Sequence, residues 1–153
     1  MCGGGDLGAD IMTGGQETYG CRGIVQGRSD GKILRSSDGI CFYRVEPHSG
    51  VMTEKGHPIE GTSVAGTVLV FPTGKGSSVV QLDGLYQLVK HGVAPSAMVV
   101  ESPDTVLVAC AVIMEIPLVT AVNPAFYERV MDGLHVAVNA GAGSVTVLSP
   151  SSE

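Results

Sequence analysis

Hydrophobic and polar positions follow two different patterns along the chain, and the change falls near residue 66. Before it, short apolar runs are separated by turn residues, as in β-strands joined by tight loops. The strands predicted there cover residues 23–27, 32–36 and 40–43, and the Asp-Gly pair at residues 30–31 predicts a hairpin between the first two. After residue 66, unbroken apolar runs alternate with segments whose apolar residues recur at helical spacing.

This second pattern predicts helices and buried strands in alternation. Strands are expected over residues 67–71, 97–101, 117–120, 134–139 and 144–148. Helices are expected over residues 79–90, 105–114 and 124–132; Pro103 is expected at the first helical position of the second, and Asn123 is expected to cap the third.

These elements predict an α/β fold in which helices are layered on a partly parallel sheet. Strands of a parallel sheet are buried on both faces and therefore read as unbroken apolar runs. We expect a flexible leader over residues 1–19, one domain over residues 20–149 and a tail over residues 150–153.

The composition is compatible with one folded domain and argues against several classes of protein. A length of 153 residues allows a hydrophobic core without disulfides. The net charge of −6, without any run of Lys and Arg, argues against a nucleic-acid partner. The longest apolar run, residues 106–114, is too short to span a membrane, and the N-terminus lacks the pattern of a secretory signal. A cytoplasmic protein is therefore expected.

The cysteines and histidines show no pattern typical of a metal site. The four cysteines are scattered without a Cys-x-x-Cys pair, so no metal ligand is predicted in this chain. Cys110 lies in an apolar run and is predicted to be a buried free thiol. His48 and His57 lie in predicted turns and are expected at the surface.

Candidate chemistry is concentrated where a predicted strand ends at residue 71 and a predicted helix begins. Gly74 and Gly76 let the backbone turn sharply and approach a ligand, and Lys75 adds a positive charge. Ser77 and Ser78 open the helix, whose free N–H groups and dipole attract an anion. A serine at this place also has an ordinary interpretation as a helix N-cap. The full Walker pattern is absent, so a nucleotide P-loop is not predicted.

This stretch and its surroundings resemble the small subunit of aconitase X-type dehydratases. The resemblance is carried by residues 66–78, 94–97 and 116–119, which read GTVLVFPTGKGSS, APSA and IPLV. Residues 54–58 and the segment that begins at Gly23 fit the same order, so the similarity covers about residues 21–122. The family implies a swivelling β/β/α domain, similar to the last domain of aconitase. That domain closes over an active site built largely by a separate large subunit.

The resemblance also implies a chemistry. Matched residue by residue, it makes Ser77 the general base and assigns substrate oxygens to Ser78 and to the loop residues Gly74, Lys75 and Gly76. It implies an iron–sulfur cluster, bound by the large subunit, as Lewis acid for the leaving hydroxyl. The expected substrate is a small anionic hydroxy acid. The first choice is (R)-5-phosphomevalonate, dehydrated to trans-anhydromevalonate 5-phosphate, and the small subunit alone is expected to be inactive.

Three other functions remain open. The chain departs from the family pattern at Arg44, Val79 and Gln81, which leaves room for another substrate, such as that of cis-3-hydroxy-L-proline dehydratase. A swivelling carrier that shuttles a phosphoryl group on histidine fits the same order of elements, although residues 105–110 contain no histidine for that role. The third alternative is a non-catalytic interaction subunit in which Ser77 only caps its helix.

Overall fold

The structure, a computed structural model, describes residues 11–13 and 16–148. Its strands are β1 Ile11–Thr13, β2 Gln16–Gly20, β3 Arg22–Val25, β4 Arg28–Arg35, β5 Val68–Phe71, β6 Ala97–Val100, β7 Leu118–Thr120, β8 His135–Asn139 and β9 Ser144–Val147. Its helices are α1 Ser78–Lys90, α2 Thr105–Met114 and α3 Pro124–Arg129, with a short 3-10 helix, η2, at Phe42–Arg44. Within these ranges no helix is long and apolar enough to cross a membrane.

The described strands form a mixed sheet in the order β1-β2-β9-β8-β4-β5-β6-β7-β3. Pairing is parallel from β4 through β5 and β6 to β7, and the other pairs are antiparallel. Every residue of β5, β6 and β7 is buried, because both faces of these central strands are covered. The predicted α/β fold with a partly parallel sheet is therefore confirmed.

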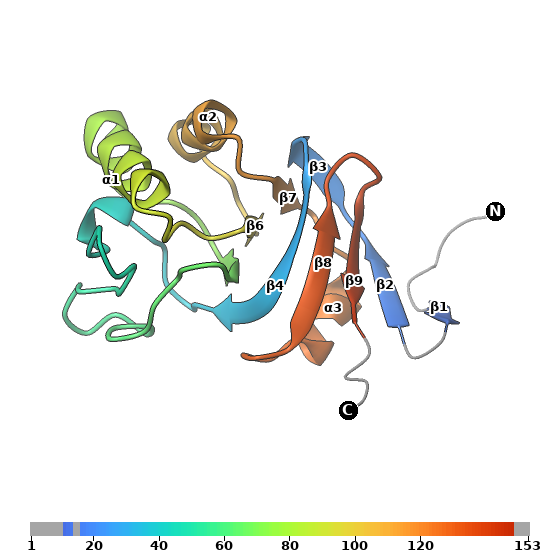
Figure 1. Cartoon of the computed structure of the whole chain (residues 1–153). Coiled ribbons are helices and arrows are strands. Elements are labelled where there is room, and N and C mark those ends of the chain that lie inside the picture. Colours follow the sequence, from blue (N-terminus) through green and yellow to red (C-terminus); the bar gives the residue numbers. More distant parts are fainter. Residues whose placement is uncertain (1–10, 14–15, 149–153) are drawn as a thin grey trace.

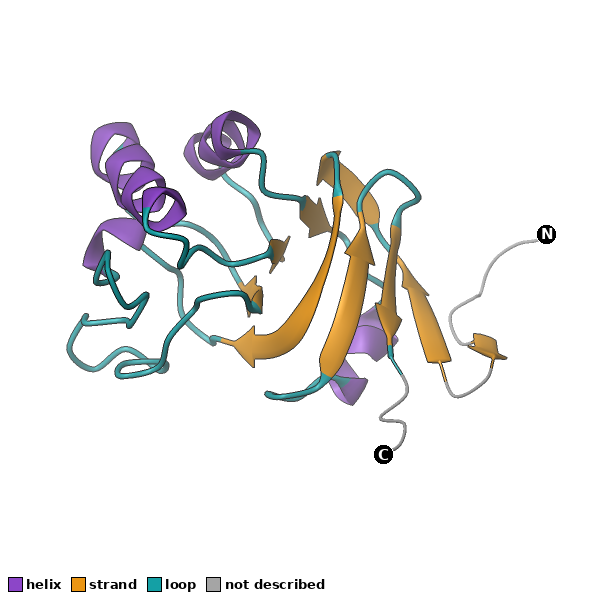
Figure 2. Ribbon diagram, viewed as in Figure 1, coloured by secondary structure: helices purple, strands orange, loops and turns teal. Residues whose placement is uncertain are grey.

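The chain packs as three layers, with α1 and α2 on one face of the parallel strands (Figure 1; Figure 2). Alternate residues of each strand point to opposite faces, and in β5 Leu69 and Phe71 pack towards these helices. Val68 and Val70 point the other way, into a second core that includes residues of β8, β9 and α3. This arrangement is the β/β/α layering that the family resemblance implied.

The hairpin predicted at residues 30–31 is wrong. Residues 28–35 form the single strand β4, which pairs with β8 over its first half and with β5 over its second half. Asp30 and Gly31 therefore lie inside a strand. A Cβ at Gly31 would lie 2.5 Å from the Gly66 carbonyl oxygen. Glycine is therefore needed here because the backbone at Gly66 packs closely against β4, and not because the chain turns.

Other sequence predictions also need correction. The strand expected at residues 40–43 is absent: Ile40 makes only a bridge to Gly74, and residues 42–43 belong to η2. The leader predicted for residues 1–19 is wrong at its C-terminal end, because residues 16–20 form β2 and pair with β9. Residues 1–10 and the tail at 150–153 lie outside the described residues.

The helix boundaries agree closely with the periodicity. Helix α1 ends at Lys90 and is followed by Gly92 with φ of 72°, the expected stop. Helix α2 covers the predicted residues, but Asp104 is its N-cap, so Pro103 precedes the helix. Helix α3 begins after the Asn123 cap as predicted and ends earlier, at Arg129.

Candidate functional site

The loop between β5 and α1 is held by backbone on one side and by a carboxylate on the other. The Ile40 N–H donates to the Thr73 carbonyl and the Lys75 N–H donates to the Ile40 carbonyl, each at 3.0 Å. The Gly74 N–H donates to Asp104 Oδ1 at 3.2 Å. Asp104 also caps α2, so it joins the starts of the two helices. The loop lies after the carboxyl end of β5, at the edge where α/β sheets commonly bind ligands.

Both glycines of the loop are required by its geometry. A Cβ at Gly74 would lie 2.8 Å from Asp104 Oδ1 and 2.9 Å from Gln81 Nε2. Gly76 has φ of 102°, and a Cβ there would approach Cys41 Sγ to 3.1 Å. The first glycine thus permits close packing and the second permits a backbone conformation that other residues rarely adopt.

Ser77 occupies the N-cap position of α1 without using its hydroxyl as a cap. Its carbonyl accepts a hydrogen bond from the Gln81 N–H at 3.0 Å, but its side chain makes no capping hydrogen bond. Ser77 and Ser78 are both exposed. Since the first N–H groups of a helix have no acceptor within it, this end of α1 presents backbone donors, the positive end of the dipole and an accessible hydroxyl together. The side-chain cap that explains many serines at helix starts does not explain Ser77.

Lys75 is paired within the chain. Its Nζ lies 3.2 Å from Asp38 Oδ2 and 3.3 Å from Glu54 Oε2, and 36% of its side chain is exposed. Burial lowers the pKa of Lys75, but hydrogen bonds and the charges of the two carboxylates outweigh it and raise the pKa above its ordinary value. The hydrogen bond from Lys75, followed by that from the Gly39 N–H, lowers the pKa of Asp38. The positive charge predicted for this loop is therefore present, but two negative charges face it.

Gln81 connects α1 to the segment that precedes η2. Its side chain is fully buried, its Oε1 accepts from the Phe42 N–H at 2.7 Å, and its Nε2 donates to the Ile40 carbonyl at 3.1 Å. The same carbonyl accepts from the Lys75 N–H, so Gln81 supports the backbone against which the loop rests. The departure from the family pattern at Gln81 thus has a structural role, while Val79 and Arg44 are exposed.

His57 is buried, which corrects its predicted surface position. Its Nδ1 accepts from the Ile59 N–H at 3.2 Å, so the proton of the neutral ring lies on Nε2, which donates to the Gly39 carbonyl at 2.8 Å. The ring therefore fixes the Asp38–Gly39 turn behind Lys75. With both nitrogens engaged in buried hydrogen bonds, His57 has no free nitrogen for phosphoryl transfer. His48, by contrast, is exposed as predicted, with 72% of its side chain accessible.

The part of the chain that the structure describes does not fit a metal centre. Within residues 11–13 and 16–148, no three His, Cys, Asp or Glu side chains gather closely enough to hold a metal ion. Cys21, Cys41 and Cys110 are free, and Cys110 is buried as predicted. Burial raises the pKa of Cys21 to about 11 and, together with the charge of Asp104, raises that of Cys110, which disfavours the thiolate that binds metals.

The structure brings the predicted residues 74–78 together in one loop and helix start, in which residues 76–78 are exposed and residues 74–75 are partly buried. It also shows contributors that the sequence analysis did not assign to the site: Asp38, Glu54, Gln81 and Asp104. A structural signal existed for Asp104, whose place before an apolar run is typical of an N-cap, whereas Glu54 and Gln81 entered the sequence analysis only through the family resemblance. No local pattern predicts that Asp38, Glu54 or Gln81 contacts the loop or the backbone that supports it.

Fold and site define the class of protein: a β/β/α domain that presents a serine and free helix N–H groups at the edge of a parallel sheet. The chain belongs to a family of this class, the aconitase X swivel domain, whose sequence profile matches residues 18–147. The predicted resemblance, including the swivelling β/β/α fold, is confirmed.

Named relatives and solved structures agree with this assignment. The chain is 40% identical to the phosphomevalonate dehydratase small subunit of Methanosarcina acetivorans over 84% of its own length and 90% of that protein. It is 39% identical to the protein of the same name from Archaeoglobus fulgidus, over 85% of this chain and 98% of the relative. Among solved structures it is similar to aconitase X from Thermococcus kodakaraensis in its holo-form, with a TM-score of 0.78 and 34% identity over 86% of this chain and 98% of that one.

Proposed function

We propose that this chain is the small subunit of a two-subunit aconitase X-type hydro-lyase, and that Ser77 is its general base. The substrate is (R)-5-phosphomevalonate, which the complex dehydrates to trans-anhydromevalonate 5-phosphate. The observation that carries the proposal is the Ser77 hydroxyl, exposed at the start of α1 and unused as a cap. The names of the relatives support the substrate and the need for a large subunit.

The step assigned to this chain is a proton transfer. Ser77 Oγ, as the alkoxide, takes the proton from the carbon next to the substrate carboxylate. The electron pair of that C–H bond forms the new double bond, and the hydroxyl on the adjacent carbon leaves. That hydroxyl leaves with the electron pair of its C–O bond, and the proton now on Ser77 Oγ neutralises it to water and regenerates the alkoxide, so atoms and charge balance. The N–H groups and dipole of the first turn of α1 stabilise negative charge on Oγ before the transfer.

The substrate-binding groups are Ser78 and the loop residues 74–76. In the chain alone, the Gly74 N–H already donates to Asp104 and the Lys75 ammonium to Asp38 and Glu54. Gly76 and Ser78 are exposed and border Ser77 directly. We therefore assign direct contact with substrate oxygens first to Gly76 and Ser78, while Gly74 and Lys75 shape the loop.

The rest of the site belongs to the partner. We assign the iron–sulfur cluster of such a dehydratase to the large subunit, and the absence of a ligand set among the described residues of this chain supports that assignment. The complex is proposed to act in the cytoplasm.

The test is to reconstitute the complex with Ser77→Ala. Since a general base contributes about 10²–10⁴-fold to the rate, we expect a loss of that size in kcat with phosphomevalonate while the complex still forms on a size-exclusion column. Ser37→Ala, at an exposed serine outside the loop, is the matched control and should retain full activity. Near-normal turnover by an assembled Ser77→Ala complex would refute the assignment. Faster turnover of cis-3-hydroxy-L-proline than of phosphomevalonate would refute the substrate alone.

A further inference from the structure

Helix α2 is apolar on the side that faces solvent as well as on the side that faces the core. Its residues after Thr105 are Val-Leu-Val-Ala-Cys-Ala-Val-Ile-Met, without one polar side chain. Leu107, Cys110 and Ala111 are buried, yet Val112 and Ile113 are 54% and 57% exposed. A helix at the surface of a soluble domain normally carries polar residues on its outer face, and an apolar outer face is typical of a helix that another surface covers.

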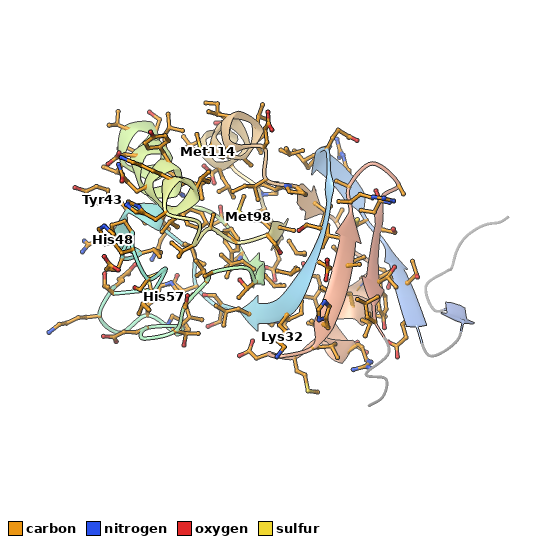
Figure 3. All side chains as sticks on the ribbon, viewed as in Figure 1. Lys32, Tyr43, His48, His57, Met98 and Met114 are labelled. Atoms are coloured by element: carbon orange, nitrogen blue, oxygen red, sulfur yellow. The ribbon has the colours of Figure 1, made fainter. Side chains whose placement is uncertain are left out.

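Helix α1 continues this apolar surface. A groove of about 400 Å³ runs between the two helices and is lined by Val79, Leu82, Asp83, Tyr86, Ile113 and Met114. Figure 3 shows Met114 where α1 and α2 face each other. Val79 and Tyr86 are 74% and 47% exposed, and Asp83 is the only charged residue of the lining. Exposed apolar patches of this kind mark interaction sites.

The groove begins in the first turn of α1, close to the proposed active site. Val79 lies in the first turn of α1, two positions after Ser77. Ser77 and Val79 are both exposed, so a partner that covers Ser77 to exclude water lies within reach of Val79, the first residue of the groove. The net charge of −6 opposes the alternative in which two copies of this chain meet through the same face.

We propose that the groove between α1 and α2 is the docking surface for an apolar segment of the large subunit. This inference rests on the proposed function, because it takes the partner from that proposal. Apolar side chains of the large subunit fill the groove beside Val79, Tyr86 and Ile113. Docking there fixes the start of α1 against the partner and so sets the position of Ser77 in the completed site.

The test compares two variants that each place a carboxylate at an exposed apolar position. Ile113→Glu lies in the groove, and Met131→Glu, at a residue 62% exposed after α3, is the matched control. Each is titrated into the large subunit by calorimetry, with circular dichroism to verify folding. We expect Ile113→Glu to raise Kd at least about tenfold, since an unpaired charge would be buried, and Met131→Glu to leave it unchanged. Equal affinities for wild type and Ile113→Glu would overturn the proposal.

A second measurement keeps the test decisive if Ile113→Glu folds poorly. In Ile113→Cys, alkylation at position 113, followed by peptide mass spectrometry, should slow at least about tenfold when the large subunit is added. An alkylation rate that the large subunit leaves unchanged would overturn the proposal. The proposal would also be overturned if the chain formed a homodimer that Ile113→Glu dissociates while the affinity for the large subunit stays the same. Ser77→Ala distinguishes the two proposals, because it should bind the large subunit normally. A complex that forms through the groove but dehydrates nothing would refute the proposed function and leave the docking surface standing.

Discussion

Replacement of Gln81 by methionine tests the packing that supports the candidate loop. Methionine has a similar volume, so the change removes two hydrogen bonds from a fully buried side chain without opening a large cavity. The two partners are affected differently. The Ile40 carbonyl keeps its hydrogen bond from the Lys75 N–H, whereas the Phe42 N–H loses the acceptor that lies 2.7 Å away.

The expected cost follows from this asymmetry. One buried N–H without an acceptor costs about 1–3 kcal/mol of unfolding free energy. For a chain of this size that corresponds to a fall in Tm of about 2–12 °C. Gln81→Ala should cost about 2–5 kcal/mol more than Gln81→Met, because it also leaves a cavity.

The assay is urea denaturation of the isolated chain, followed by far-ultraviolet circular dichroism. Gln87→Met is the matched control, because Gln87 lies on the same helix but is only partly buried. Its effect should stay within about 0.5 kcal/mol. If Gln81→Met were as stable as wild type within the same margin, the hydrogen bond to Phe42 would not support the fold and the reasoning would be refuted.

Two further predictions concern η2 and the turn that follows it. Gly84→Ala should lower the free energy of unfolding by at least about 1 kcal/mol in the same assay, because the new Cβ would lie 2.4 Å from η2 backbone atoms, and this outweighs the helix preference of alanine. Asp83→Ala, at the exposed neighbouring position, is the control and should be nearly neutral. A Gly84→Ala variant more stable than wild type would contradict the packing of α1 against η2. Hydrogen bonds from Ser49 and then His48 lower the pKa of Glu46 from 4.5 to about 2. The ionised Glu46 carboxylate therefore stabilises the fold fully above pH 4.5, and this stabilisation is lost as the pH falls towards 2. The Tm difference between wild type and Glu46→Gln should shrink over that window. A Tm difference that stays constant from pH 4.5 to 2 would contradict this role of Glu46.

The parts of the fold that were predictable are those whose signal is local. Strands β5, β6 and β7 are unbroken apolar runs, and α1 and α2 follow them with the expected spacing and stops. The hairpin at residues 30–31 was wrong because β4 pairs with β8, whose residues lie about a hundred positions further along the chain. An Asp-Gly pair predicts a turn only where no distant strand competes for the same backbone.

The candidate site also has a part that the local sequence predicts and a part that depends on distant residues. The loop glycines and Ser77 belong to one short stretch, and their geometry follows from the turn between a strand and a helix. The partners of Lys75 come from 37 and 21 positions away, and the Phe42 N–H lies 39 positions from Gln81. Burial of His57 depends on a carbonyl 18 positions away. None of these contacts leaves a periodic or spaced pattern that a sequence could reveal.

The charges around the loop explain why this chain should need its partner to activate Ser77 and not only to bind the substrate. Asp38, Glu54 and Asp104 contact the loop or its lysine, and Lys75 is the one ammonium among them. Three carboxylates and one cation leave the surroundings of the loop with a net negative charge, whereas a serine base needs surroundings that stabilise the alkoxide. The dipole and N–H groups of α1 oppose this effect only in part, because exposed dipoles are weakened by water. On the proposed function, the large subunit must therefore both cover Ser77 and bring positive charge to it, so the isolated small subunit is inactive even when substrate is abundant.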